Sequence, residues 1–199
     1  MVRAVNVGLV LYPGVDELDV AAPLAVFAAA RTIATPGQAR PVNFEVFALA
    51  ESLDVVESSG GMKVLPSDLA STSPGLDVLL VPGAMVDPPP ERVEALVSLV
   101  REFARDAQLV AASGSGVFLL ARAGLLNGKR VTCHPEALAE LKRFDATVPV
   151  KAKVVADGST LTSSGRSASI DMALEVVRRL ASRELADAVA RRLNHVAVE

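Results

Sequence analysis

The stretch "LVAASGSGVFLLARAGLL", residues 109–126, combines a strand pattern and a helix pattern on either side of a tight turn. It begins as a short apolar run, passes through a turn of very small residues and continues as an amphipathic helical pattern. A buried strand that turns sharply into a helix has the outline of a nucleophile elbow, whose apex residue needs small neighbours two positions away. Ala112 and Gly116 flank Gly114 at this spacing. The pattern therefore places the apex at Gly114, which has no side chain to react.

Outside this stretch, apolar runs and helical patterns alternate along the chain. The runs rich in Val and Leu predict strands at 5–12, 42–49, 77–83 and 108–113. Helical patterns lie at about 21–31, 90–106, 115–123, 135–143 and 167–197. Asp157-Gly158 between two β-prone runs predicts a hairpin. The class is therefore α/β, a doubly wound and mostly parallel sheet with helices on both faces, in a single domain over 1–199.

Composition narrows the function classes. Hydrophobic residues make up 51% of the chain, aromatic residues only 4%, and the formal net charge is −3. Neither a basic surface nor stacking aromatic residues are present for nucleic acid, and no apolar run is long enough to cross a membrane. The single cysteine favours a reducing, cytoplasmic setting, and no Cys/His cluster has metal-ligand spacing. We expect no metal, no cofactor, no nucleic-acid partner and no membrane partner.

Four segments together resemble a known family. They are "VGLVLYPGVDELDVAAPLAVF" (7–27), "DVLLVPGA" (77–84), "ASGSGVFLLARAGLLNGKRVTCH" (112–134) and "DGSTLTSSGRSASIDMALEVV" (157–177). They are similar to the ThiJ/PfpI superfamily, the class I glutamine-amidotransferase-like proteins, and within it to the branch of isocyanide hydratase and AraC-type sensor domains. The resemblance implies a flavodoxin-like fold, a homodimer and a small-molecule pocket.

The resemblance also implies a cysteine nucleophile, which this chain lacks at the expected place. In that branch the elbow reads Cys-Thr-Gly before a helix that ends Ala-Gly-Leu-Leu. Aligned on residues 123–126, the family Cys falls on Gly114, the Thr on Ser115 and the Gly on Gly116. Glycine reaches positive φ without steric cost, so this replacement relaxes a strained turn while it removes the thiolate.

The resemblance supplies further candidate site residues. Asp19 matches the acid that the family places beside the cysteine, but it can equally cap a helix that starts near Val20. Gly83 and Ala84 match the turn whose backbone N–H groups act as oxyanion donors, although the family usually has glycine at the second position. With Gly114 and Gly116 they form the expected ligand-binding set. An ordinary strand-ending turn is the alternative for Gly83 and Ala84.

Polar residues near the elbow have two interpretations each. His134 is either a chemical participant or a structural histidine, and Cys133 is either a thiolate or a buried, inert thiol on a strand. Ser113 and Ser115 could replace the nucleophile if Asp19 or His134 acted as base, or they could bond to backbone groups at the helix start. His195, near the C-terminus, is expected to be solvated.

Three functions follow. The first is a small-molecule binding or regulatory protein with little or no catalysis, whose elbow N–H groups attract a carboxylate or another small anion. The second is a hydratase, amidase or glyoxalase-like enzyme that uses Asp19 with water, or a serine. The third is the ligand-sensing module of a regulator; because no DNA-binding segment follows the last family helix, a partner protein would transmit the signal.

Overall fold

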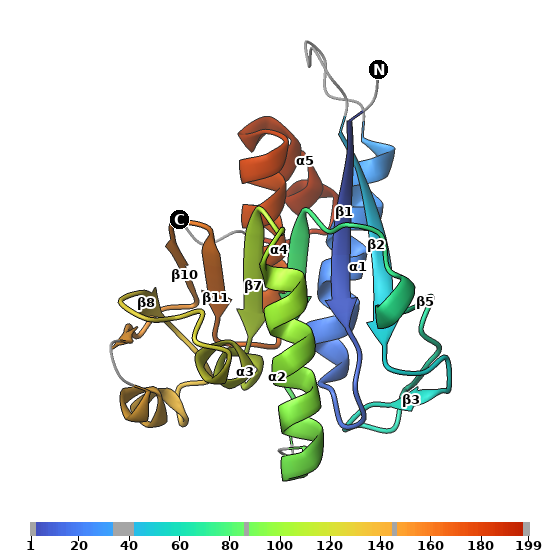
Figure 1. Cartoon of the computed structure of the whole chain (residues 1–199). Helices are drawn as coiled ribbons and strands as arrows, with labels where there is room; N and C mark the ends of the chain where they lie inside the picture. Colours follow the sequence, from blue (N-terminus) through green and yellow to red (C-terminus); the bar gives the residue numbers. More distant parts are fainter. Residues whose placement is uncertain (1–2, 34–41, 86–87, 145–146, 197–199) are drawn as a thin grey trace.

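A seven-stranded sheet forms the centre of the molecule in the computed structural model, which describes residues 3–33, 42–85, 88–144 and 147–196 (Figure 1). The sheet order is β10-β11-β7-β6-β1-β2-β5. Its strands are β1 (Arg3–Val10), β2 (Val42–Ala50), β5 (Asp68–Leu69), β6 (Val78–Val81), β7 (Leu109–Ser113), β10 (Val154–Asp157) and β11 (Thr160–Ser163). All neighbours pair in parallel except β10 and β11, which form the predicted hairpin with Gly158 at a φ of 59°.

Helices cover both faces of this sheet. α1 (Glu17–Thr32), α4 (Ala168–Leu180) and α5 (Arg183–Arg192) pack together on one face, and α2 (Pro90–Ala104) and α3 (Gly116–Arg122) on the other (Figure 1). Two-stranded ladders pair β3 (Val56–Glu57) with β4 (Lys63–Val64) and β8 (Arg130–Val131) with β9 (Val148–Pro149). The 3-10 helices are η1 (Ala70–Thr72) and η2 (Leu138–Arg143). The doubly wound, flavodoxin-like α/β fold is confirmed.

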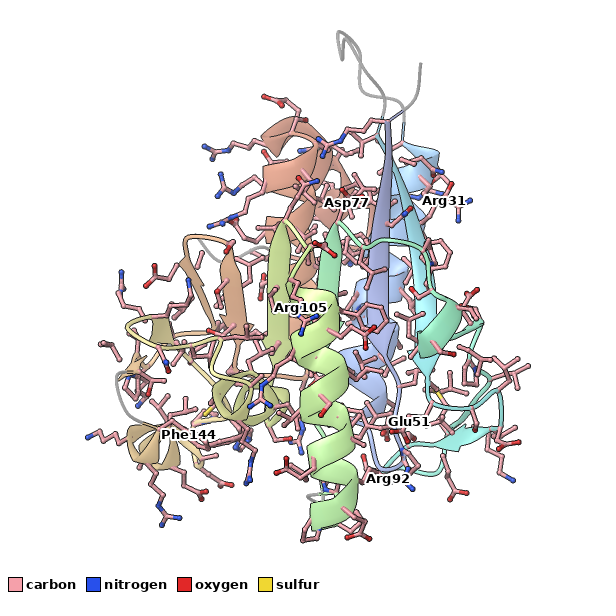
Figure 2. The ribbon with its side chains drawn as sticks, in the orientation of Figure 1. Arg31, Glu51, Asp77, Arg92, Arg105 and Phe144 are labelled. Carbon is pink, nitrogen blue, oxygen red and sulfur yellow. The ribbon has the colours of Figure 1, made fainter. Side chains whose placement is uncertain are left out.

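The core lies on both sides of the central strands. β6 and β7 are buried along their whole length, because helices cover both of their faces. Their Val and Leu side chains belong to one contiguous cluster of buried apolar residues, which also includes Phe27 and Phe44 stacked at 5.2 Å. Charged side chains such as Arg31, Glu51 and Arg105 are exposed on the outer surface (Figure 2).

Two predicted helices differ from the structure. The pattern at 167–197 is divided into α4 and α5, because the Ser182 hydroxyl accepts a hydrogen bond from Leu185 N and caps a new helix. The segment at 135–143 contains only the short helix η2. Pro135 favours an extended conformation for the residue before it, which delays the start of any helix.

The expectation that His195 is solvated was wrong. The chain after α5 turns back onto the first turn of α4, where His195 Nε2 lies 2.7 Å from Asp171 Oδ1. The histidine side chain is only 19% exposed. The sequence pattern shows a basic helix face here, whereas the contact depends on a carboxylate 24 residues earlier.

Candidate functional site

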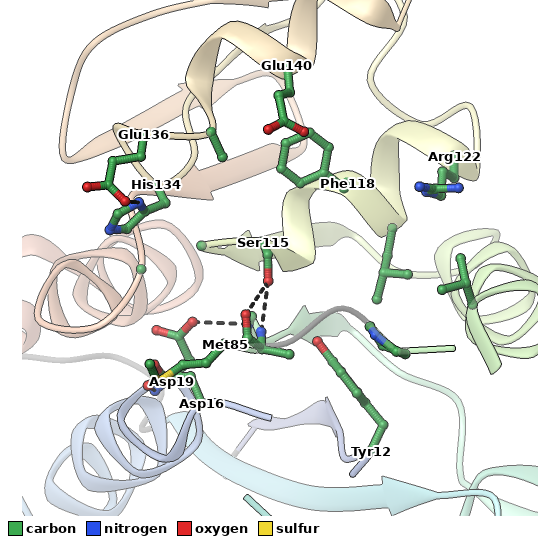
Figure 3. A pocket seen from close by; sticks show the side chains of 18 of the residues that line it. Tyr12, Asp16, Asp19, Met85, Ser115, Phe118, Arg122, His134, Glu136 and Glu140 are labelled. Atoms are coloured by element: carbon green, nitrogen blue, oxygen red, sulfur yellow. Dashed lines mark hydrogen bonds and ion pairs between the residues drawn. The ribbon is translucent and has the colours of Figure 1, made fainter. Parts of the chain in front are cut away.

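A pocket opens where four parallel strands end. β1, β6, β7 and β11 are neighbours in the sheet, so their carboxyl ends lie at one edge, which is where α/β proteins bind ligands. The cavity at this edge has a volume of about 940 Å³. Figure 3 shows Asp19 and Ser115 at its floor and His134 with Glu136 on a wall.

The turn at residue 114 has the expected elbow conformation. Gly114 has a φ of 53°, between the end of β7 and the start of α3, and its N–H donates to Ser163 O at 3.1 Å. A Cβ built on Gly114 would lie 3.3 Å from Asp19 Oδ2 and 3.8 Å from Gly83 Cα. A side chain at this turn would therefore face the Asp19 carboxylate in a tight contact.

Close backbone packing explains two other glycines around the elbow. A Cβ on Gly116 would lie 2.4 Å from Pro82 O, so this residue must be glycine for α3 to pack against the end of β6. Gly116 is buried and is not among the residues that line the pocket, so its predicted ligand binding stays a prediction. A Cβ on Gly165 would lie 2.9 Å from Gly114 Cα. Both glycines allow the chain segments to approach each other at the floor.

Asp19 faces the elbow and does not cap α1. That helix begins earlier than predicted, because Asp16 accepts hydrogen bonds from Leu18 N and Asp19 N and is the N-cap. The Asp19 side chain, only 2% exposed, accepts from Gly83 N at 3.0 Å, from Ser169 Oγ at 2.6 Å and from Arg166 N. One carboxylate thus joins the turn after β6, the loop after β11 and the first turn of α4.

Ser115 and Ala84 bind each other across the floor. The Ser115 hydroxyl accepts from Ala84 N at 2.8 Å and donates to Ala84 O at 2.9 Å (Figure 3). Ser115 precedes α3 without capping it, contrary to one of the two predicted roles. Gly83 N donates to Asp19 and Ala84 N donates to Ser115, so both predicted oxyanion donors are hydrogen-bonded within the protein.

The other serine of the elbow is enclosed. Ser113 is 1% exposed, and its hydroxyl has no hydrogen-bond partner among the described residues. A nucleophile must reach substrate and hydrogen-bond to a base. Ser113 meets neither condition, and the Ser115 hydroxyl is directed to the Ala84 backbone instead of to a base.

His134 and Cys133 lie near the pocket in different environments. The His134 side chain is 39% exposed, and its Nδ1 lies 3.9 Å from Glu136 Oε2. Cys133 is buried just beyond the end of β8, not on the strand itself. Burial, with a smaller contribution from the negative charge of Glu140, raises the pKa of its thiol from 9.0 to about 11.

The raised pKa of Cys133 predicts a loss of stability at alkaline pH. Burial favours the neutral thiol, so its stabilisation is fully present below pH 9.0 and is lost as the pH rises towards about 11. Urea unfolding of the wild type and of Cys133→Ala should therefore show the wild type losing more stability over this interval. Parallel stability curves for the two proteins would contradict the raised pKa.

Several contributors to the site were not predicted. Ser169 and the Arg166 backbone bind Asp19, and the acidic side chains of Glu94 and Glu140 line the walls. Arg166 has a φ of 52°, an unusual conformation for a residue with a side chain, which is held by its bond to Asp19. The small residues of "SSGRSAS" at 163–169 were the available signal.

No group of His, Cys, Asp and Glu in the described ranges could hold a metal ion. Among the helices of those same ranges, none combines the length and the apolar character needed to cross a membrane.

The fold and the turn at Gly114 define a flavodoxin-like α/β protein with a nucleophile-elbow architecture. The chain belongs to the DJ-1/PfpI family, whose model matches residues 5–179. An isonitrile hydratase from Pseudomonas putida is 32% identical over 192 residues, which cover 96% of this chain and 79% of that protein. The predicted resemblance to the ThiJ/PfpI superfamily is confirmed.

Solved structures agree with this fold. A ThiJ/PfpI family protein from Pseudomonas syringae matches with a TM-score of 0.83 at 24% identity, over 100% of this chain and 78% of that chain. An AraC family transcriptional regulator from Pseudomonas putida matches with a TM-score of 0.82 at 24% identity, over 95% of this chain and 99% of that chain. At this identity the two structures establish the shared fold.

Proposed function

We propose that this protein binds a small molecule in the pocket at Gly114 and does not carry out thiolate catalysis. The observation that carries the proposal is the elbow itself: Gly114 has the positive φ of an apex residue, faces Asp19 and has no side chain. In this proposal glycine stands where the family has its nucleophile. A covalent intermediate on a thiol is then impossible at this position.

The arrangement around the apex further supports binding over catalysis. The backbone N–H groups of Gly83 and Ala84 are bonded to Asp19 and Ser115, so they are not free to stabilise an oxyanion. The cavity of about 940 Å³ is large enough for a small organic ligand. Asp19, Gly83, Ala84, Gly114 and Ser115 all line it. These features support a pocket that binds a ligand without forming a covalent bond to it.

A ligand that occupies the pocket should raise the melting temperature. We expect a molecule retained through purification, or found in a metabolite panel, to raise Tm by about 5 °C when present well above its Kd. Ala137→Trp would fill the pocket and abolish the shift, since Ala137 lines the cavity. Ser71→Trp, on the exposed η1, is the matched control that should keep it. If the ligand raised Tm equally in the wild type, Ala137→Trp and Ser71→Trp, the ligand would bind outside this pocket.

A second candidate is a hydratase, which the 32% identity to an isonitrile hydratase favours. Hydration of an isonitrile adds water at its terminal carbon and yields a formamide. In this candidate Asp19 Oδ2 would take a proton from the attacking water and pass it to the isonitrile carbon, while the water oxygen bonds to the same carbon. The formimidic acid formed in this way would move its hydroxyl proton to nitrogen, which gives the formamide. The hydrogen bonds of Ser115 to Ala84 argue against the serine version of this mechanism.

We also propose one domain, a homodimer and a cytoplasmic location. The single contiguous core supports one domain. Exposed apolar side chains support association: Leu18 at the start of α1 is 42% exposed and Met62 is 39% exposed. Glu17 binds Ser59 and Gly60, so α1 and the segment between β3 and β4 lie together. Sedimentation equilibrium should give twice the monomer mass of 20.7 kDa, and a monomer would contradict the proposal.

A further inference from the structure

Four backbone donors at the pocket floor are already used within the protein. Gly83 N donates to Asp19 Oδ2, Ala84 N donates to Ser115 Oγ, Gly114 N donates to Ser163 O and Arg166 N donates to Asp19 Oδ1. A carboxylate or oxyanion ligand is held by free N–H groups. At these four positions it would have to break an existing hydrogen bond. A small anion therefore finds no free donor among these four groups.

The Asp19 carboxylate, in contrast, has one acceptor position open. A carboxylate offers about four lone-pair positions. Oδ1 accepts from Arg166 N and Ser169 Oγ, whereas Oδ2 accepts only from Gly83 N among the described residues. Oδ2 lies 3.3 Å from the position that a Cβ of Gly114 would take. Its open acceptor position is thus next to the space that the missing side chain leaves.

No cationic side chain pairs with this buried carboxylate within the described ranges. Its three donors are two backbone N–H groups and a hydroxyl, and the nearby Arg166 guanidinium instead lies 3.5 Å from Asp16 Oδ2. A buried charge without an oppositely charged partner is costly, so a cation delivered to Oδ2 gains both a hydrogen bond and an ion pair.

The walls of the pocket favour the same kind of ligand. Five carboxylate side chains and three guanidinium groups line the cavity, so the charge that a ligand meets is negative overall. Aromatic rings also line it: Phe118, Phe144 and Tyr12. The Phe118 and Phe144 rings pack with their centroids 5.9 Å apart. Aromatic faces beside carboxylates suit an organic cation.

We propose that the ligand is a small organic ammonium whose N–H group donates to Asp19 Oδ2 in the space beside Gly114. This assignment rests on the proposed binding function and adds the chemical class of the ligand. Ser115 determines the selectivity against anions, because its hydroxyl occupies the Ala84 N–H group. Asp19 supplies the attraction for the cation.

Three probes of similar size test the assignment: ethylammonium, acetamide and acetate. Their binding is followed by the amide signals of Gly114 and Ser115 in two-dimensional NMR titrations of the intact protein. In the wild type, ethylammonium should bind about tenfold more tightly than acetamide, as expected for a charge-assisted hydrogen bond, and acetate should bind most weakly. Ser115→Ala frees the Ala84 N–H group and should strengthen acetate binding by several-fold.

A matched control removes a carboxylate outside the pocket. Glu51→Gln neutralises an exposed residue that does not line the cavity, and it should leave the relative affinities of the three probes unchanged. If this variant no longer bound ethylammonium more tightly than acetamide and acetate, the proposed role of Asp19 would be wrong. Wild-type binding of acetate or acetamide at Gly114 in preference to ethylammonium would overturn the ligand class while the binding function stands. Failure of every probe and every panel molecule to bind at Gly114 would contradict the binding function itself.

Discussion

Gly114→Cys should introduce a thiol that iodoacetamide alkylates about 100-fold faster than it alkylates Cys133 at neutral pH. The introduced side chain would point from the elbow towards Asp19, because its Cβ would lie 3.3 Å from Asp19 Oδ2, a tight contact that the carboxylate relieves by a small shift. Cys133 is 1% exposed, and its thiol pKa is raised to about 11, so it has little thiolate at this pH. Positive φ should lower the stability of the variant by about 1 kcal/mol.

The matched control for this variant is Gly124→Cys. Gly124 also has a positive φ, 76°, but it is exposed and no atom lies within 4 Å of its Cβ position. The Gly124→Cys variant therefore measures how fast a thiol on a positive-φ residue is alkylated when it lies outside the pocket. We expect the Gly114→Cys thiol to differ from this control in the pH dependence of alkylation, because only the former meets Asp19. Labelling of Gly114→Cys as slow as that of Cys133 would show that the elbow is closed to reagents.

Gly116→Ala should destabilise the protein by about 3 kcal/mol, with a Tm lower by about 10 °C. The added Cβ would lie 2.4 Å from Pro82 O and 2.5 Å from Val81 O, both backbone atoms that cannot turn away. Either α3 or the end of β6 must move, and the floor of the pocket moves with them. Thermal unfolding followed by circular dichroism measures the effect.

Gly75→Ala is the control for this change. No atom lies within 4 Å of the Cβ position at Gly75, which also lacks a positive φ. The substitution should leave the stability within about 0.5 kcal/mol of the wild type, or raise it slightly. If the two variants melted at the same temperature, the close packing of Gly116 against β6 would be wrong.

The sequence was sufficient for the parts of the molecule that depend on local pattern. The alternation of apolar runs and helical patterns predicted the sheet and its helices, because burial on both faces requires continuous Val and Leu runs in parallel strands. Spacing around the elbow placed the apex at Gly114, and its φ of 53° confirms that conformation. Asp157 and Gly158 predicted the hairpin for the same reason, since the turn chemistry is contained in neighbouring residues.

Contacts between residues far apart in the sequence could not be predicted from local sequence patterns. Asp19 binds Ser169 and Arg166 across 150 and 147 residues, and no local periodicity encodes such a pairing. The exchange of hydrogen bonds between Ser115 and Ala84 likewise depends on how closely α3 packs on the end of β6. The same limit explains His195, whose carboxylate partner lies on another helix. Satisfaction of buried polar groups is decided only when the chain has folded.

The absence of catalysis at the elbow is tested most directly by an isonitrile hydration assay. Purified wild-type protein is incubated with an aliphatic isonitrile, and the formamide product is quantified beside Asp19→Asn, whose folding is checked by circular dichroism. We expect the wild type to form no more formamide than Asp19→Asn or buffer alone. Repeated turnover by the wild type that Asp19→Asn abolishes would contradict it and would establish the hydratase alternative.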